Sequence, residues 1–423
     1  MKLKLEKLSA VILLFSASSS AWAAGYAIQE QSVTGLGRAF AGSAAVAEDA
    51  STIFFNPAGL TYLDRAEMDI GLNYIAPKSE FNNNGSSIAG VIPLSGGDYG
   101  DAGKNAILPN FYYAKPINDK LSLGLGISAP FGLVTDYNET WVGRYFAVKS
   151  DLKTVNFNPS IAFKATEKLS VGAGISAQFI DLTLSQMVDL GAALGPGPQL
   201  ADGKAKLKAD DWGFGFNVGL LYQMTGNTRI GLAYRSKIAH TLEGDGKLRD
   251  ADGNLLSKEN IQGDVDLPET VSLAINHDIN DTWSIMADAT LTRWTRFEEL
   301  VIESDGPFLS AEKTEDWDNS MRYSLGVSYR YSPKWQFRTG IAYDESPISS
   351  AERRTARIPG NDRKWVALGA TYRYSDNIII DAGYAHLFID DPKINETDDN
   401  GYNLKGSYDA SVDLLGLQLR WLM

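Results

Sequence analysis

The 423-residue sequence contains no cysteine and only three histidines, His240, His277 and His386. Without cysteine, disulfides, thiolate metal sites and cysteine nucleophiles are excluded. The sequence also lacks an uninterrupted apolar run of the roughly 18 residues that a membrane-spanning helix needs. Basic residues are in the minority, 39 Lys and Arg against 52 Asp and Glu, which gives a net charge of −13. Since nucleic-acid partners require a basic face, we expect no nucleic acid to bind.

The first 23 residues have the three regions of a secretory signal. Three lysines lie within the first seven residues, residues 8–15 form an apolar core, and Ala21-Trp22-Ala23 provides a small-residue cleavage site. The core is too short to cross a bilayer. A buried N-terminal helix is the alternative, but this order of charge, apolar core and small residues favours a cleaved signal peptide at residues 1–23.

Apolar and polar residues alternate along most of the remaining chain. The clearest stretch has one apolar face, formed by Trp212, Phe214, Phe216, Val218, Leu220 and Tyr222. The residues between them are small or polar, namely Gly213, Gly215, Asn217 and Gly219. Because successive side chains of a strand point to opposite faces, this pattern indicates strands with one apolar and one small polar face. A helix would spread the same residues around its circumference.

This alternation predicts fourteen strands. The expected spans are 68–76, 107–115, 121–134, 152–164, 169–184, 212–223, 229–242, 268–279, 283–296, 321–332, 335–345, 364–374, 377–389 and 408–423. Several apolar faces begin or end with Trp or Tyr, as in the aromatic girdles of membrane barrels. The residues concerned are Trp212, Tyr222, Trp283, Trp335, Tyr343 and Trp421.

The connections between these strands alternate between short and long. The long ones are 77–106, 135–151, 185–211, 243–267, 297–320, 346–363 and 390–407. Short periplasmic turns and long extracellular loops are typical of bacterial outer-membrane barrels. A soluble sandwich would not alternate so regularly, and a propeller would show an internal repeat. We therefore predict an all-β fold, a fourteen-stranded antiparallel transmembrane β-barrel over residues 68–423, in the outer membrane of a Gram-negative bacterium.

Residues 24–67 break the pattern. The stretch 35–50 is rich in Gly, Ala and Ser and suits short, tightly packed helices. A flexible periplasmic tail is the alternative, but a tail would be polar, whereas this segment contains Phe40, Ile53, Phe54 and Phe55. We expect residues 24–67 to form a hatch that plugs the barrel lumen, which implies gated passage rather than an open sieve.

The N-terminal segment ends in Phe54-Phe55-Asn56-Pro57-Ala58-Gly59-Leu60. Together with Gly35 onward, it resembles the N-terminal hatch of the FadL family of outer-membrane transporters, whose Asn-Pro-Ala motif stands here at 56–58. The resemblance continues through 212–217, 337–342, 362–365 and 393–396 and covers essentially the whole mature chain. It implies a fourteen-stranded barrel with a hatch and the uptake of hydrophobic compounds, typically long-chain fatty acids or aromatic hydrocarbons.

The third expected strand contains Pro130 and Gly132. Proline lacks the N–H that a sheet ladder uses, and glycine weakens a strand interior, so this strand is a candidate for a kink with an opening in the wall. Equally, Pro130 could lie beyond the membrane. In the family that the chain resembles, this strand is kinked inward and the Asn-Pro-Ala motif lies against the kink. The resemblance thus implies that Asn56, Pro57, Ala58, Pro130 and Gly132 form the hatch and lateral gate. Because a buried amide needs partners, we expect the Asn56 amide to bond to unpaired backbone groups at the kink.

Apolar residues should line the route of a hydrophobic ligand, because removing apolar area from water stabilises it by about 25 cal/mol per Å². Phe54, Phe55 and Phe131 are the candidates for substrate binding, although each could instead only pack the hatch against the wall. Apolar residues in the first and third long loops are candidates for initial capture. They are Ile88, Val91, Ile92, Leu94, Leu190, Leu194 and Leu200.

The site for a carboxylate head is less clear. Fatty-acid members of the family use an Arg near the end of the fifth strand and a Lys before the tenth. This chain has no Arg or Lys between Lys168 and Lys204, so that charge-assisted capture is not carried over. Arg322 and Lys313 are the candidates to replace them. This departure from the family pattern favours a neutral substrate.

No catalytic or metal-binding motif is present: the sequence contains neither Gly-x-Ser-x-Gly nor His-Glu-x-x-His. We expect no enzyme activity, no cofactor and no metal. The function that we expect is the uptake of hydrophobic small molecules, mainly long-chain fatty acids, by passive diffusion with lateral exit at the third-strand kink. Alternatives are a channel for neutral aromatic or aliphatic hydrocarbons and a surface-binding barrel such as an adhesin or phage receptor. Expected partners are the substrate, outer-membrane lipid and lipopolysaccharide, with the barrel working as a monomer.

Overall fold

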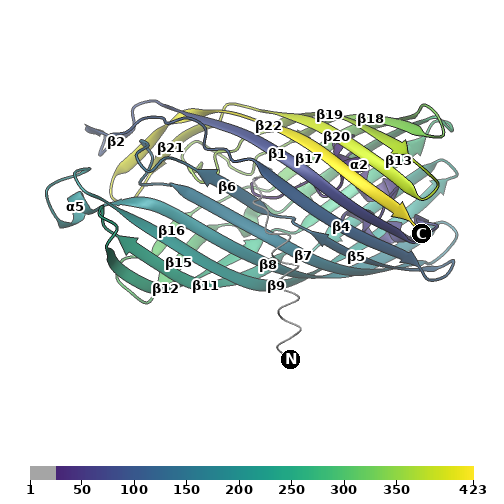
Figure 1. Cartoon of the computed structure of the whole chain (residues 1–423), viewed down its shortest axis with the longest axis horizontal. Coiled ribbons are helices and arrows are strands. Elements are labelled where there is room, and N and C mark those ends of the chain that lie inside the picture. Colours follow the sequence, from purple (N-terminus) through teal and green to yellow (C-terminus); the bar gives the residue numbers. More distant parts are fainter. Residues whose placement is uncertain (1–24) are drawn as a thin grey trace.

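The computed structural model describes residues 25–423, so the predicted signal peptide lies outside the described residues. The chain forms a closed antiparallel barrel of fourteen strands, which confirms the predicted fold. Strand β22 (Tyr402–Leu422) pairs with both β20 (Ile378–Ile389) and β1 (Glu67–Asn83), and this pairing closes the sheet. Figure 1 shows the strands running obliquely along the long axis, with the C-terminus at one end.

Three of the fourteen wall strands are interrupted, and two of these three are neighbours in the barrel. After β1, the wall consists of β4 (Ala106–Pro116), β5 and β6 (Leu121–Ser128, Gly132–Asp136), β7 (Lys149–Lys164), β8 (Leu169–Asp189), β9 (Asp202–Thr225), β10 and β11 (Thr228–Arg235, Ile238–Arg249), β12 and β13 (Leu255–Leu267, Thr270–Asp278), β14 (Trp283–Thr292), β17 (Ser320–Arg330), β18 (Trp335–Asp344), β19 (Arg363–Arg373), β20 and β22.

The outer face of the wall is apolar and the inner face is polar, as the alternation predicts. On β22, Leu415 and Leu417 are 58% and 59% exposed, whereas Gln418 between Leu417 and Leu419 is buried. All six predicted girdle residues have exposed side chains on the outer face. Because a lipid-facing surface must be apolar, this pattern fits a barrel that crosses a bilayer.

The long connections contain more strand than the sequence predicts. The spans 243–267, 297–320 and 390–407, expected as loops, include most of β11 and β12, together with β15 (Glu299–Ser304), β16 (Ala311–Thr314) and β21 (Lys393–Thr397). The reason is that hairpins outside the bilayer are wetted on both faces, so they lack the alternation by which membrane strands are recognised. Short elements β2 (Ser87–Ile88), β3 (Ile92–Pro93) and α5 (Leu190–Leu194) lie at the same end of the barrel (Figure 1).

The N-terminal residues lie inside the barrel. They form α2 (Val33–Leu36), α3 (Ser43–Val46), α4 (Thr52–Phe55) and the 3₁₀ turn η1 (Pro57–Tyr62), which contact strands all around the wall. Strand β1 begins at Glu67, one residue before the predicted start. We call residues 25–66 the hatch segment. Among the described residues, no helix is long and apolar enough to cross a bilayer.

Inward-facing glycines allow the hatch segment to touch the wall. A Cβ at Gly231 would collide with the carbonyl oxygen of Ala44. Hatch backbone comes similarly close at Gly172, Gly340 and Gly369. Glycine has no Cβ, so hatch backbone and strand backbone can meet directly at these points.

Candidate functional site

A cavity lies between the hatch segment and the wall. It contains about 840 Å³ of atom-free space, including the part open to solvent. All three predicted binding residues, Phe54, Phe55 and Phe131, line it, together with Pro57 and Pro130. Asn56, Ala58 and Gly132 do not. The structure thus brings five of the eight predicted site residues to one space.

The third wall strand is interrupted where the sequence predicts. Strand β5 ends at Ser128, opposite Asn156, and β6 begins at Gly132, opposite Lys153. The third strand therefore has one residue more than β7 over this interval. On its other side, the ladder with β4 ends at the pair Phe111–Ile127, so β6 has no continuous neighbour there. We call residues 129–131 the first break.

The N-terminal end of the hatch segment occupies the place of the missing neighbour. Ile28 N donates to Pro130 O at 2.8 Å, and Gly132 N donates to Tyr26 O at 2.9 Å. The Gln31 side chain adds a bond to Ala129 O at 2.8 Å. We call residues 26–31 the edge segment. It satisfies backbone groups of the first break that would be costly to leave unpaired inside a membrane.

Asn56 does not bond to the first break, contrary to the sequence-based expectation. Its Nδ2 donates to Ala44 O at 2.7 Å and to Leu220 O of β9 at 3.0 Å, and its Oδ1 accepts from Ala58 N. The motif 56–58 therefore packs against Gly172 and Gly219 on β8 and β9. The physical reason is that the amide finds nearer carbonyls within the hatch segment, while backbone from the edge segment already pairs with the kink.

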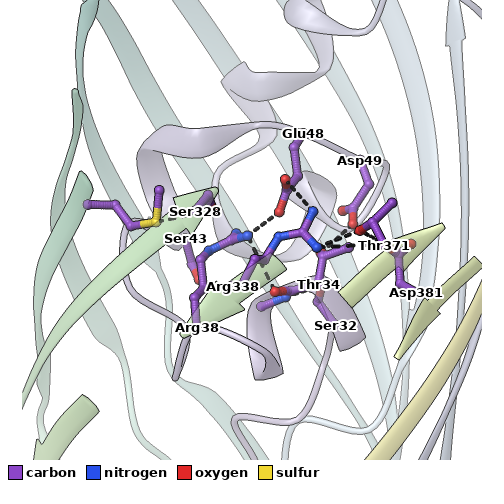
Figure 2. Close-up of polar contacts among 12 residues, drawn as sticks. Ser32, Thr34, Arg38, Ser43, Glu48, Asp49, Ser328, Arg338, Thr371 and Asp381 are labelled. Atoms are coloured by element: carbon purple, nitrogen blue, oxygen red, sulfur yellow. Dashed lines mark hydrogen bonds and ion pairs between the residues drawn. The ribbon is translucent and has the colours of Figure 1, made fainter. Parts of the chain in front are cut away.

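Buried polar contacts hold the hatch segment to strands β18 and β22, and Figure 2 shows the ion pair between Glu48 and Arg338. The Glu48 carboxylate lies between Arg38 of the same segment and Arg338 of β18, with Arg338 at 3.0 Å. Arg420 of β22 donates to Glu48 O at 2.6 Å and pairs with Glu67 at 2.7 Å. Removing one member of such a buried set leaves the others unpaired, so this contact holds the segment firmly.

Two carboxyl groups of the hatch segment have opposite pKa shifts. Burial alone would raise the pKa of Glu48, but the guanidinium groups of Arg338 and Arg38 outweigh it and hold the pKa well below its ordinary value. Burial raises the pKa of Glu30, in the edge segment, to about 7, and the nearby Arg363 and Arg322 only partly oppose it. The anchor at Glu48 is therefore ionised at neutral pH, whereas the edge segment contains a carboxyl that titrates there.

Sequence reasoning missed the aromatic cluster that covers the edge segment. The Tyr26 ring lies 4.8 Å from that of Trp294 and 6.0 Å from that of Phe131, between ring centroids. Phe297 and Trp317 complete the cluster. Trp294 lies in η2 (Trp294–Arg296), just beyond β14. The only available signal was the gathering of aromatic residues in the polar connection 297–320, without any pattern that points to a partner.

Only some of the predicted charged and loop residues lie where the sequence analysis expects them. Arg322 lines the cavity, whereas Lys313 is paired with Glu396 at 2.8 Å and does not. Of the predicted capture residues in the loops, Val91, Ile92, Leu194 and Leu200 are exposed, but Ile88 and Leu94 are buried. Within residues 25–423, no three acidic or His side chains come together in a way that could hold a metal ion.

A closed barrel with a lipid-facing outer surface, an internal segment and a cavity lined in part by aromatic residues beside a break in its wall defines the class of outer-membrane transport proteins. The sequence matches the family described as outer membrane protein transport protein (OMPP1/FadL/TodX) over residues 14–422. The chain belongs to this family, which confirms the resemblance and the outer-membrane location. The family consists of transport channels rather than enzymes, as expected.

Similar proteins agree with this assignment. The long-chain fatty acid transport protein of Escherichia coli O6:H1 is 32% identical over 409 residues, covering 90% of each chain. The crystal structure of a Pseudomonas aeruginosa FadL homologue superposes with a TM-score of 0.89 at 28% identity, covering 94% of this chain and 99% of that one. The toluene transporter TbuX of Ralstonia pickettii, with a TM-score of 0.67 at 21% identity over 92% of this chain and 100% of that one, shares the fold.

Proposed function

We propose that this protein carries hydrophobic small molecules, mainly long-chain fatty acids, across the outer membrane by diffusion, and that they leave sideways into the bilayer at the first break. The observation that carries the proposal is the cavity itself, because it reaches Pro130 and Phe131 at the break. The similarity to the long-chain fatty acid transport protein of Escherichia coli supports fatty acids as the substrate class.

The aromatic part of the lining explains how such a ligand is held. Phe54 and Phe55 are half-buried, with ring centroids 5.1 Å apart, and both face the cavity. Apolar area that leaves water on binding contributes about 25 cal/mol per Å². The fold also occurs in toluene transporters, so a neutral hydrocarbon is the second candidate for the substrate.

The edge segment gives the exit a physical gate. It closes the first break with two backbone hydrogen bonds and one side-chain bond rather than with a covalently continuous wall strand. Its displacement would open the wall between β4 and β6 beside the cavity. The anchor at Glu48 holds the rest of the hatch segment, so passage sideways needs a smaller movement than passage through to the periplasm. Because the sheet closes on itself, we propose that the barrel works as a monomer, surrounded by lipid and lipopolysaccharide.

The first experiment tests uptake. Cells that lack their own hydrophobic channel are given either this protein or an empty vector, and initial uptake of radiolabelled oleate and toluene is measured. We expect oleate uptake above the vector level. Equal uptake by the two cell lines for both compounds would refute the proposed function.

The second experiment tests the lateral exit. Deleting Pro130 removes the extra residue, so that Ala129 and Phe131 come opposite Val155 and Thr154 and β5 and β6 join in one register. We expect uptake to fall toward the vector level while the amount of heat-modifiable barrel stays the same. If the repaired strand transports as well as the wild type, lateral exit is wrong and passage past the hatch segment to the periplasm is the better explanation.

A further inference from the structure

Arg235, the last residue of β10, is a partly buried cation without an acidic partner. Among residues 25–423, no carboxylate oxygen lies within the 4.0 Å limit of an ion pair to its guanidinium. Three other arginines that point at the hatch segment differ, whereas Arg229, which also lacks an ion pair, does not line the cavity. Arg322 has Asp288 at 4.0 Å, Arg338 has Glu48 at 3.0 Å and Arg420 has Glu67 at 2.7 Å.

The structure holds the Arg235 guanidinium in place without saturating it. Its Cζ lies 4.2 Å from the centroid of the Phe54 ring, and Nη2 donates to Phe54 O at 2.8 Å. Nη1 makes a long bond to Ser176 Oγ at 3.4 Å. A guanidinium has five N–H donors, so several of them have no protein acceptor. The group is thus oriented by the hatch segment yet free to bind an additional acceptor.

The same guanidinium faces the cavity. The charged residues of the lining are Arg235, Arg322 and Asp288, so the lining has a formal charge of +1 (two cations and one anion). This sign is opposite to that of the chain, whose net charge is −13. Since Asp288 lies beside Arg322, the uncompensated charge belongs to Arg235.

We propose that Arg235 binds the carboxylate head of a long-chain amphiphile whose tail lies along Phe54 and Phe55 toward the first break. This inference rests on the proposed function and selects among its substrates: a fatty acid satisfies Arg235, whereas a neutral hydrocarbon does not. An arginine fork matches the two oxygens of a carboxylate, and both bonds are charge-assisted. A neutral ligand of the same shape leaves the guanidinium buried and unpaired, which is unfavourable.

The test compares two ligands that share one chain but differ in the head. Dissociation constants of oleate and oleyl alcohol are measured on the purified barrel in lipid nanodiscs, with empty nanodiscs subtracted. For the wild type we expect tighter binding of oleate. Arg235→Gln should weaken oleate binding by about tenfold or more, because it removes hydrogen bonds to a charged group, and should change oleyl alcohol binding less than about twofold. Arg235→Lys, which keeps the charge but loses the fork, should fall between.

Arg229 provides the matched control. It lies on the same inward face of β10, stacks 4.5 Å from the ring centroid of the hatch residue Tyr62, and does not line the cavity. Arg229→Gln removes the same charge and should leave both dissociation constants unchanged. An equal loss of oleate binding in the two variants would overturn the proposal, because the effect would then come from net charge alone.

The remaining outcomes separate this inference from the proposed function. If Arg235→Gln weakens both ligands equally, Arg235 only shapes the cavity and the proposal is wrong. If the wild type binds oleyl alcohol as tightly as oleate, the headgroup site is refuted while uptake of hydrophobic molecules stands. If neither ligand binds above empty nanodiscs and cells show no uptake, the proposed function fails as well.

Discussion

At residues 129–131 the third wall strand has no neighbour on the β4 side, whereas at residues 236–237 the seventh wall strand leaves the ladder of β9. We call the latter the second break. After the pair Arg235–Asn217, the next paired residues are Glu243 and Asp210. Over this interval the seventh wall strand advances eight residues while β9 advances seven. Each break therefore contains one additional residue, and the cavity reaches both.

Residues of the wall itself seal the second break. Ser236 N donates to Phe216 O, and the Ser236 hydroxyl accepts from Phe216 N, both at 2.9 Å. His240 Nδ1 lies 3.0 Å from Asp211 Oδ2. The side chain of Ile238 presses against Gly213 and Gly215, where no Cβ would fit. On the side away from β9, strands β10 and β11 pair with β13 and β12, and the register of this pairing does not change across the break.

The two breaks differ in the part of the chain that closes them. The second break has two paired neighbours in the sheet, so opening it would require the wall to unfold. The first break is closed by the edge segment, which is held to it by a few noncovalent contacts. Under the proposed lateral exit, a bulge of the same size is a permanent seal where wall strands cover it and a gate where the edge segment covers it.

Disulfide locks should give the largest difference between the two breaks. Ala27 and Phe131 are a non-hydrogen-bonded antiparallel pair, the kind with the closer side chains, and the chain has no other cysteine. We expect oxidised Ala27→Cys/Phe131→Cys to reduce oleate uptake to the vector level and reductant to restore it. The matched lock, Asp210→Cys/Glu243→Cys at the first residue pair beyond the second break, should leave uptake unchanged under both conditions. Inhibition by both locks would show that the second break also opens.

Charge removal at the anchor should have the next largest effect. Glu48→Gln leaves Arg38 and Arg338 without their shared carboxylate and should destabilise the seating of the hatch segment by about 3–5 kcal/mol. Hydrogen exchange of residues 33–62 is the measurement, and it should accelerate while the barrel strands stay protected. The control is Glu269→Gln beside the second break, where Arg293 and Arg296 lose their partner at 3.0 and 2.9 Å. Faster exchange of the hatch segment in this control would contradict the separation of the two regions.

The edge segment should respond to pH through Glu30. Its pKa in the folded protein, about 7, lies above the ordinary value of 4.5, so the closed state loses stability as pH rises through this interval and changes no further above it. The reactivity of a single cysteine at position 27 toward a thiol reagent should therefore rise with pH up to about 7, relative to the same cysteine in Glu30→Gln. Parallel pH profiles in the two backgrounds would exclude Glu30 as the titrating group.

Single hydroxyls should give the smallest effects. At the first break, Thr154 Oγ1 accepts from Phe131 N at 3.0 Å and donates to Phe131 O at 2.7 Å. We expect Thr154→Ala and Ser236→Ala each to cost about 1 kcal/mol in unfolding free energy. Only Thr154→Ala should also increase the reactivity of a cysteine at position 27. An equal increase from Ser236→Ala would mean that the two breaks are mechanically coupled.

Local rules were sufficient for the wall and for part of the site. Alternation with period two gives the strand count and the lipid-facing side because a strand fixes the direction of each side chain. Pro130 and Gly132 mark the first break because their backbone constraints are local. The aromatic residues 54, 55 and 131 could be selected because a hydrophobic route requires apolar side chains.

Contacts between residues far apart in the sequence were decided only by the tertiary structure. Whether Asn56 bonds to the third strand or to Leu220 depends on where the hatch segment rests, and no local pattern encodes this. The pairing of Tyr26 and Ile28 with the first break joins residues about 100 positions apart. Arg235 looks like any inward arginine in the sequence, and only the folded arrangement shows that its counter-charge is missing. Closure of the barrel sets these distances, because it places strands and hatch segment around one shared lumen.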